Sequence, residues 1–261
     1  MIDVNAYLGH FAFRQLRHNT AAGLLRLMDR FGIERAVVSS AAALTYRNSQ
    51  AGNEEVAAEV ESHRSRLIPF AVLNPAYAGW QDDLKICHEQ FGMKGLRLFP
   101  RWHDYTLADR RCRALVEAAA ERRMVISIPV RVEDRRQSSW LVSIPDLEYD
   151  EIAGLIRACP KARFIVSNAS GVAASVLGRK NSGLPDNYAV DITRLNVELG
   201  NELGQVLGAL GEDRVMFGSG IPFHYAGIAL ARIEMLQASE AVKAKIRSQN
   251  AARWLGLSAG Q

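Results

Sequence analysis

Four residues that commonly transfer protons in enzymes stand just after short apolar runs of this chain. His103 lies in a loop rich in aromatic residues, and His224 lies one loop beyond the last apolar run. Histidine is the first candidate for acid–base catalysis because its unperturbed pKa of ~6.5 lies nearest neutrality. Glu133 and Asp191 follow two further runs and are candidates for a base or a histidine partner. We therefore predict His103, then His224, as general acid or base, with the two carboxylates completing the catalytic set.

Arginines and neutral polar residues follow the other apolar runs. Arg97, Arg131 and Arg135 are expected to present planar donor forks to a carboxylate or a phosphate. The alternative is that these arginines pair internally with Glu133, Asp134 or Asp191. The remaining predicted substrate-binding residues are Asn5, Tyr7, Tyr105, Asn168 and Ser219.

A covalent nucleophile has no support in the sequence. No serine stands in a Gly-x-Ser-x-Gly motif, and no cysteine ends an apolar run. Cys87, Cys112 and Cys159 are scattered through helical patterns. We expect them to be reduced thiols in the core of a cytoplasmic protein, with no disulfide.

The elements that position these residues alternate along the chain. Short β-branched runs predict strands, and the longer amphipathic stretches between them predict helices. The predicted strands are 1–5, 35–39, 67–72, 94–98, 124–128, 163–167, 188–192 and 214–217, and the main predicted helices are 21–31, 54–64, 81–91, 108–121, 149–158 and 197–210. Strand–helix alternation with almost wholly apolar strands indicates a parallel sheet covered on both faces.

A weak internal repeat sets the number of units. Segments 31–38, 91–98 and 210–217 each run from the end of a helix through a glycine into a strand. Units of roughly thirty residues give eight in a chain of 261 residues, which is the number that closes a (β/α)8 barrel. We predict a single-domain α/β TIM barrel over residues 1–261, in preference to an open doubly wound sheet. Active sites of such barrels lie at the carboxyl ends of the strands.

Composition and charge narrow the choice of partners. Hydrophobic residues make up 48% and charged residues 23% of the chain, as in ordinary globular proteins. No apolar run approaches the ~20 residues of a membrane span, and the first residues do not resemble a signal peptide. A net charge of +4 without aromatic-interleaved basic runs does not indicate nucleic acid. We expect a small-molecule substrate, with a homo-oligomer as an open alternative.

Several segments resemble the amidohydrolase-related family of TIM barrels. The opening Ile2-Asp3-Val4-Asn5-Ala6-Tyr7-Leu8-Gly9 is similar to that family's first strand, Ile-Asp-x-His-x-His-x-Gly. Segments 32–37, 67–75 and 92–100 resemble its second, third and fourth strands, and 215–222 resembles its Phe-Gly-Ser/Thr-Asp-x-Pro. The resemblance spans nearly the whole chain in order and implies the barrel fold.

The positions that would hold the family's divalent ion differ in this chain. Asn5 and Tyr7 replace the paired histidines, Asn168 replaces a further histidine, and Gly220 replaces the aspartate of the eighth strand. An amide oxygen and a neutral phenol are poor zinc ligands. The resemblance therefore implies a divergent subgroup with a degenerate metal site, and we expect no cofactor. The alternative is a divalent metal such as zinc, held by His103, Glu133, Asp191 and His224.

These observations lead to an expected function. The resemblance implies an enzyme, and the family's usual reaction is hydrolysis. We expect a hydrolase that acts on a small anionic or polar metabolite by acid–base catalysis without the ancestral metal. The alternatives are a lyase or isomerase on the same barrel, and a non-catalytic ligand-binding barrel.

Overall fold

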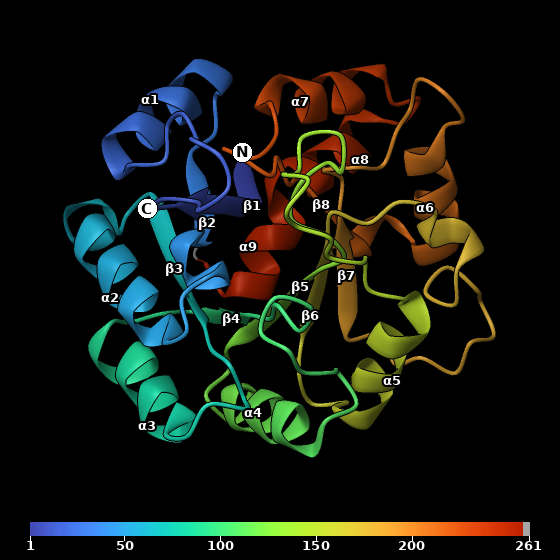
Figure 1. The fold of residues 1–261 in the computed structure, drawn as a ribbon. Helices are drawn as coiled ribbons and strands as arrows, with labels where there is room; N and C mark the ends of the chain where they lie inside the picture. Colours follow the sequence, from blue (N-terminus) through green and yellow to red (C-terminus); the bar gives the residue numbers. More distant parts are fainter. Residues whose placement is uncertain (258–261) are drawn as a thin grey trace.

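Eight parallel strands form the centre of the molecule (Figure 1). A computed structural model describes residues 1–257. The strands are β1 (Ile2–Leu8), β2 (Arg35–Ser40), β3 (Leu67–Val72), β4 (Gly95–Arg97), β5 (Val125–Pro129), β6 (Phe164–Ser167), β7 (Tyr188–Asp191) and β8 (Val215–Met216). They are hydrogen-bonded in chain order. The ring closes where Val4 N donates to Phe217 O at 3.0 Å, and where Ala6 pairs with Ile221. The predicted single-domain (β/α)8 barrel is confirmed.

Helices surround the strands (Figure 1). They are α1 (Ala21–Phe31), α2 (Ser49–Val60), α3 (Trp80–Lys85), α4 (Arg110–Glu121), α5 (Tyr149–Ala158), α6 (Glu202–Leu210), α7 (Ala226–Met235), α8 (Glu240–Ala244) and α9 (Asn250–Leu255). No helix of the described chain is long and apolar enough to cross a bilayer. Local sequence explains their ends: α1, for example, begins after the Thr20 cap and ends at Gly32, whose φ is 64°.

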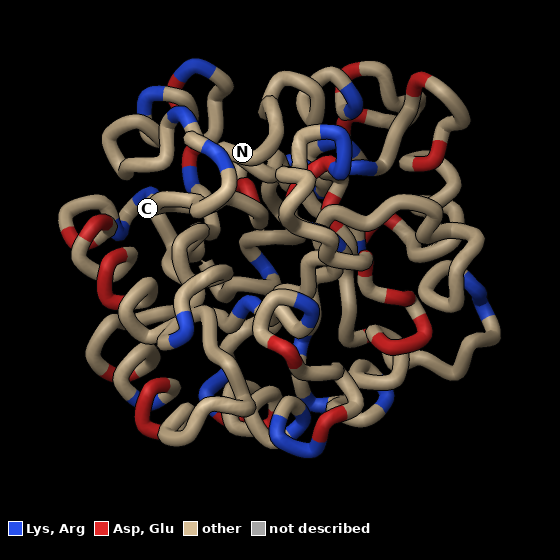
Figure 2. The backbone as a smooth tube through the Cα atoms, in the orientation of Figure 1, with Lys and Arg blue, Asp and Glu red and all other residues tan. Residues whose placement is uncertain are grey.

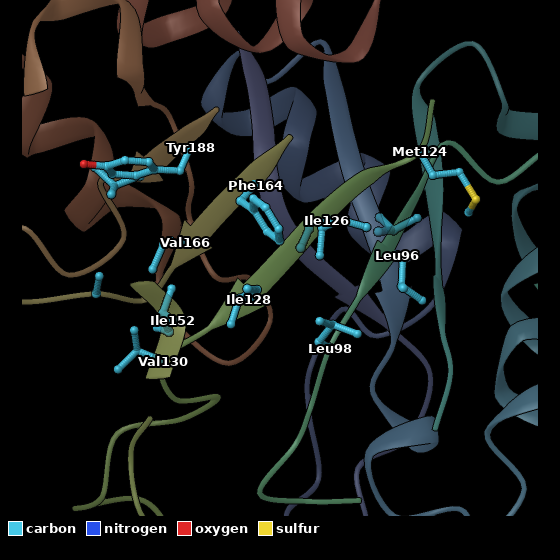
Figure 3. Close-up of a cluster of buried hydrophobic side chains, with 14 of the residues drawn as sticks. Leu96, Leu98, Met124, Ile126, Ile128, Val130, Ile152, Phe164, Val166 and Tyr188 are labelled. Carbon is cyan, nitrogen blue, oxygen red and sulfur yellow. The ribbon is translucent and has the colours of Figure 1, made fainter. Parts of the chain in front are cut away.

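The larger core lies between the strands and the helices. In Figure 3 the side chains of Leu96, Ile126 and Phe164 project from β4, β5 and β6 toward this layer. All three predicted core cysteines are buried and free. Apolar burial on this scale is the main driving force that holds the helices on the barrel.

A second apolar cluster fills the amino-terminal end of the barrel. It contains Phe70, Val125 and Ile165, and Trp254 of α9 packs against it. Figure 1 shows α9 lying across the ring of strands. Gly95 is required here, because a Cβ at that position would come within 2.3 Å of the Phe70 ring. This end of the barrel is therefore solidly packed and has no room for a ligand.

Three of the differences between predicted and observed element boundaries have a clear local cause. β1 runs to Leu8 and not to Asn5, because Tyr7 N still donates to Ile221 O at 2.8 Å beyond the end of β8. Helix α2 begins five residues earlier than predicted, at Ser49, because Asn48 caps it. Helix α6 begins five residues later than predicted, at Glu202, where Asn201 accepts a hydrogen bond from Gly204 N. In the second and third cases the cap fixes where the helix begins.

Candidate functional site

A polar layer lies inside the barrel above the apolar end. Two residues after the inward-facing Gly95, Val125, Ile165 and Ala189, the strands carry Arg97, Ser127, Ser167 and Asp191. This spacing follows from the period of two in a strand. All four polar side chains are fully buried. Because water does not reach these buried side chains, they must form hydrogen bonds with one another or with the backbone.

Arg97 connects opposite sides of the barrel. From β4 its guanidinium donates to Ala6 O at 3.0 Å and Val4 O at 3.2 Å, both on β1, and to Ser127 Oγ at 3.2 Å. It also lies 4.6 Å from the centre of the Tyr7 ring. These donors are engaged by the protein itself. The structure thus places Arg97 in the barrel interior, away from any position open to a substrate.

Asn5 and Asp191 form a second interior group. The Asn5 amide donates to Asp191 Oδ2 at 2.9 Å, and lies within 3.2 Å of Asn168 Oδ1 and Thr193 Oγ1. Asp191 also accepts from the backbone N–H groups of Asn168 and Thr193. Burial raises the pKa of Asp191, and these hydrogen bonds oppose that rise. Asp191 and Asn5 therefore hold the ends of β1, β6 and β7 together.

Asp3 is a buried carboxylate that our sequence reasoning missed. Its oxygens accept from Asn5 N, Ser219 N and Ser219 Oγ, which accounts for the predicted Ser219. Burial raises its pKa from 3.8 to about 7, against the effect of these hydrogen bonds. A polar residue inside an apolar strand was the available signal. Asp3 locks β1 to the segment after β8.

Asp3 predicts a pH-dependent stability. Below about pH 4 the carboxyl is protonated in both the folded and the unfolded chain. Between about pH 4 and pH 7 only the unfolded chain releases the proton, so stability falls as pH rises, by up to about 4 kcal/mol from this group. Asp3→Asn, which keeps an acceptor for the two backbone donors, should flatten this fall in urea titrations. An Asp3→Asn profile as steep as the wild-type profile would contradict the assignment, and exposed Asp186→Asn serves as control.

Aromatic side chains cover the polar layer at the mouth of the barrel. The Tyr7 and Phe223 rings meet edge to face at 5.0 Å, and Phe223 meets Phe11 at the same distance. Phe99 and Trp102 adjoin this group. Tyr7, Phe11, Phe99 and Phe223 are buried. The polar interior is thus closed off, and a substrate must bind outside this aromatic layer.

A cavity of about 640 Å³ lies beyond the carboxyl ends of β4 and β5. Its walls come from the segments 99–102 and 129–147, with the exception of residues 134, 136, 137 and 141. Phe99, Trp102 and Leu147 supply apolar surface, and Glu133 contributes a carboxyl group. This volume suits a small molecule. We take this cavity as the candidate active site.

Arginines outnumber carboxylates around the cavity. Arg131 and Arg135 both pair with the single carboxylate of Asp146. Arg101 pairs with Glu151 at 2.5 Å. Because Arg131 and Arg135 share one carboxylate, one positive charge is left over, and the Arg14–Glu133 pair at 3.3 Å lies beside them. Internal pairing, the alternative to substrate binding for these arginines, is observed for Arg131 and Arg135, but with Asp146 as the partner.

Glu133 is the buried acid of the cavity. Its side chain is 5% exposed, and Arg14 NH2 lies 3.3 Å from Oε2. Burial raises the pKa of Glu133, and Arg14 and Ser138 act in the opposite direction. A carboxyl group with a raised pKa beside an apolar wall is suited to donating a proton.

The other predicted catalytic residues lie away from the cavity wall. His103 is buried, its Nε2 lies 2.9 Å from Ala43 O, and burial lowers its pKa. His224 lies against Gly220, and burial lowers its pKa to about 4, so it is neutral at pH 7. Asp191 is enclosed in the barrel. Tyr105 belongs to the apolar core between strands and helices. The structure therefore does not bring the four predicted catalytic residues together.

Comparison with known proteins places this barrel in a class of enzymes. The amidohydrolase family profile matches residues 12–257. The chain belongs to the amidohydrolase family. No curated protein gave a match.

Solved structures share the fold at low sequence identity. Over 98% of this chain and 99% of the other, it resembles 2,6-dihydroxybenzoate decarboxylase from Rhizobium, with a TM-score of 0.75 and 19% identity. A dihydroxybenzoic acid decarboxylase from Polaromonas sp. JS666, solved with manganese and 2-nitroresorcinol, matches over 91% and 86% at TM-score 0.70 and 18% identity. A putative amidohydrolase from Staphylococcus aureus matches over 98% and 100% at TM-score 0.70 and 14% identity.

These comparisons correct two expectations. The expected function, hydrolysis without a metal, is wrong, since the similar structures include decarboxylases, which are lyases. The expectation of no cofactor is also wrong for this family, because related structures contain bound manganese. The membership of an enzyme family also goes against a purely non-catalytic barrel.

The residues of this chain do not fit the manganese of those relatives. Among residues 1–257 no three His, Cys, Asp or Glu side chains group as a metal site would require. Asn5 turns its amide nitrogen, not its oxygen, toward Asp191. At Gly220, whose φ is 71°, even a Cβ would come within 2.5 Å of His224, so an aspartate has no room. We assign no reaction step to a metal here.

Proposed function

We propose that this protein is a lyase that decarboxylates a small hydroxylated aromatic acid in the cavity between the loops after β4 and β5. The observation that carries the proposal is the composition of this cavity. Flat apolar walls, one unmatched arginine charge and the buried acid Glu133 stand together in it. The names of the similar structures, decarboxylases of dihydroxybenzoate and carboxyvanillate, support this substrate class.

Arginines attract and hold the substrate in this proposal. Arg135 is 66% exposed and lies 3.3 Å from Asp146, so it is held loosely enough to turn to an incoming carboxylate. Arg131 is held more firmly by Asp146. The aromatic ring of the substrate lies against Phe99 and Trp102. An anion with a flat apolar body complements such a cavity.

Glu133 donates the proton in this proposal. Its carboxyl proton is transferred to the ring carbon that bears the carboxylate, and a new C–H bond forms. The bond between the ring and the carboxylate then breaks, its electron pair returns to the ring, and CO2 leaves. A water molecule restores the proton to Glu133, and the hydroxide that remains combines with CO2 to give bicarbonate. Because the carboxylate loses its charge as CO2 forms, the apolar wall at Val130 and Leu147 favours this step.

A panel of hydroxybenzoates, including 2,6-dihydroxybenzoate, tests the proposal, with CO2 release as the readout and unsubstituted benzoate as control. Each assay is run as purified, with added manganese, and after chelation. Arg135→Gln should raise KM about tenfold with little change in kcat, since it removes a charged hydrogen-bond donor from binding. Arg136→Gln, on an 88% exposed neighbour that does not line the cavity, is the matched control. Absence of CO2 release under all three conditions would rule out the proposal.

A further inference from the structure

Arg194 is a half-buried arginine without hydrogen-bond partners. It follows β7 by three residues, and its side chain is 22% exposed. An arginine carries five N–H donors, yet Arg194 donates to no residue in 1–257, and its buried Nε has no partner. Asp134 Oδ2 lies 3.9 Å away, but that carboxylate already accepts two bonds from the Arg136 guanidinium. Arg194 is therefore positioned without an acceptor of its own.

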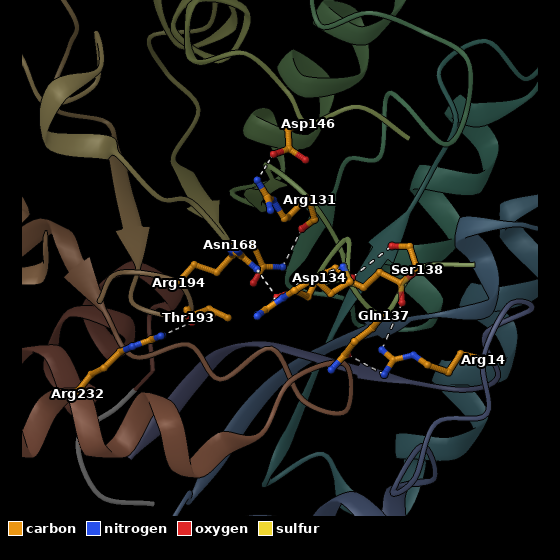
Figure 4. Close-up of polar contacts among 12 residues, drawn as sticks. Arg14, Arg131, Asp134, Gln137, Ser138, Asp146, Asn168, Thr193, Arg194 and Arg232 are labelled. Atoms are coloured by element: carbon orange, nitrogen blue, oxygen red, sulfur yellow. Dashed lines mark hydrogen bonds and ion pairs between the residues drawn. The ribbon is translucent and has the colours of Figure 1, made fainter. Parts of the chain in front are cut away.

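A neighbouring arginine shows that this is not the rule at this end of the barrel. Arg232 of α7 lies against the same segment, and it donates to Ile192 O and Thr193 O (Figure 4). Both arginines have a buried Nε without a partner, but only Arg232 donates from an Nη atom to backbone carbonyls. Carrying a half-buried guanidinium with unused donors costs stability unless something accepts them.

Other donors gather around Arg194. Figure 4 shows Arg131, two residues beyond β5, with its guanidinium turned toward Asp146, and Arg194 near Asn168. The Nε of Arg131 is buried and has no partner. Burial lowers the pKa of Arg194, and the charge of Arg131 lowers it further, so the two cations are close enough to repel each other.

The local charges do not balance. Ion pairs connect four arginines to only two aspartates here, which leaves two positive charges; the group is Arg131, Arg135, Arg136, Arg194, Asp134 and Asp146. Over the rest of the chain, acidic and basic residues are interspersed (Figure 2). A surplus of cations with unused donors is suited to an oxyanion.

We propose that Arg194 and Arg131 form an oxyanion-binding site at the mouth of the barrel beside β6 and β7, for the phosphate or carboxylate group of a small molecule. Planar guanidinium forks bind both groups in a bidentate manner. The loops after the seventh and eighth strands are a common place for phosphate binding in barrels of this kind. The site shares Arg131 with the cavity of the proposed decarboxylation, but Arg194 lies outside that cavity's lining, and binding of a simple anion alone defines the site.

Titration with inorganic phosphate, and separately with acetate, tests this site by calorimetry at low ionic strength. Arg194→Gln should weaken binding at least tenfold. Asp134→Asn should strengthen it severalfold, because the competing carboxylate is neutralised while an amide oxygen still accepts from Arg136 N. Remote Arg253→Gln, on a 56% exposed arginine, should match the wild type. Circular dichroism confirms that each variant is folded.

The two anions distinguish the source of the group. Tighter binding of phosphate indicates a phosphorylated ligand, and equal or tighter binding of acetate indicates a carboxylate. Unchanged affinity in Arg194→Gln, an affinity in Asp134→Asn no higher than that of the wild type, or no binding of either anion by the wild type would each overturn the proposal. None of these outcomes bears on CO2 release from hydroxybenzoates, so the two proposals fail separately.

Discussion

Replacement of Glu133 by glutamine should lower kcat for decarboxylation at least a hundredfold while leaving KM nearly unchanged. General acid catalysis typically contributes 10²–10⁴-fold, and an amide of the same shape cannot supply the proton. Glutamine keeps the volume of the 5% exposed side chain, so the fold and the cavity are expected to persist. Steady-state rates of CO2 release, with a thermal melt of each variant, are the measurements.

The variant Arg14→Gln complements Glu133→Gln, because it should change the pKa of Glu133 and leave the carboxyl group in place. Arg14 opposes the rise that burial causes in the pKa of Glu133. A proton donor must be protonated, so activity falls as pH rises through its pKa in the substrate-bound enzyme. Without Arg14 the pKa of Glu133 should rise, and the fall in kcat should move to higher pH with turnover retained. A hundredfold loss in Arg14→Gln, or full activity in Glu133→Gln, would remove Glu133 from the reaction.

The barrel could be predicted from the sequence because it rests on properties that repeat. The apolar strand recurs eight times, and an amphipathic helix follows it in most units, although the segment after β6 holds only the 3-10 turn Val172–Ala174. A boundary misplaced by a few residues, as at Ser49 or Glu202, does not change the count of units. Parallel pairing in chain order then follows from the strand–helix alternation.

The site was harder to predict, because a position at the end of a strand does not show whether the side chain faces the barrel interior or the cavity between the loops. Arg97 is the last residue of β4 and Arg131 follows β5 by two residues, yet Arg97 donates to carbonyls of β1 across the barrel and Arg131 lines the cavity. Whether a side chain turns inward depends on the buried polar groups inside the barrel, and the sequence did not identify Asp3 as one of them. Arg14 and Asp146 come from distant loops, and no local pattern marks them as partners of Glu133 and Arg131.

The resemblance gave the family correctly but not the reaction. The departures at Asn5 and Gly220 are real, since one is bonded to Asp191 and the other has no room for a side chain. Hydrolysis did not follow from them, because one barrel supports many reactions through its loops. The function of this chain must therefore be sought in the loop cavity and not in the closed interior.

Arg97→Met should destabilise the protein by about 3–5 kcal/mol, because two buried carbonyls each lose their donor at a cost of about 1–3 kcal/mol. Methionine fills much of the same space but leaves Val4 O and Ala6 O without donors inside the barrel. At about 2–4 °C per kcal/mol for a chain of this size, the melting temperature should fall by roughly 10 °C or more.

Arg101→Met is the control, because its ion pair with Glu151 is partly exposed on both sides and should contribute no more than about 1 kcal/mol. Arg97 was predicted from the sequence to bind substrate. An assay at low temperature distinguishes this role from a structural role in the barrel. If Arg97 is a support of the barrel, Arg97→Met assayed well below its melting point should retain the wild-type KM. A raised KM with unchanged stability would instead restore Arg97 to the substrate site and would mean that the aromatic layer over the interior opens to admit a ligand.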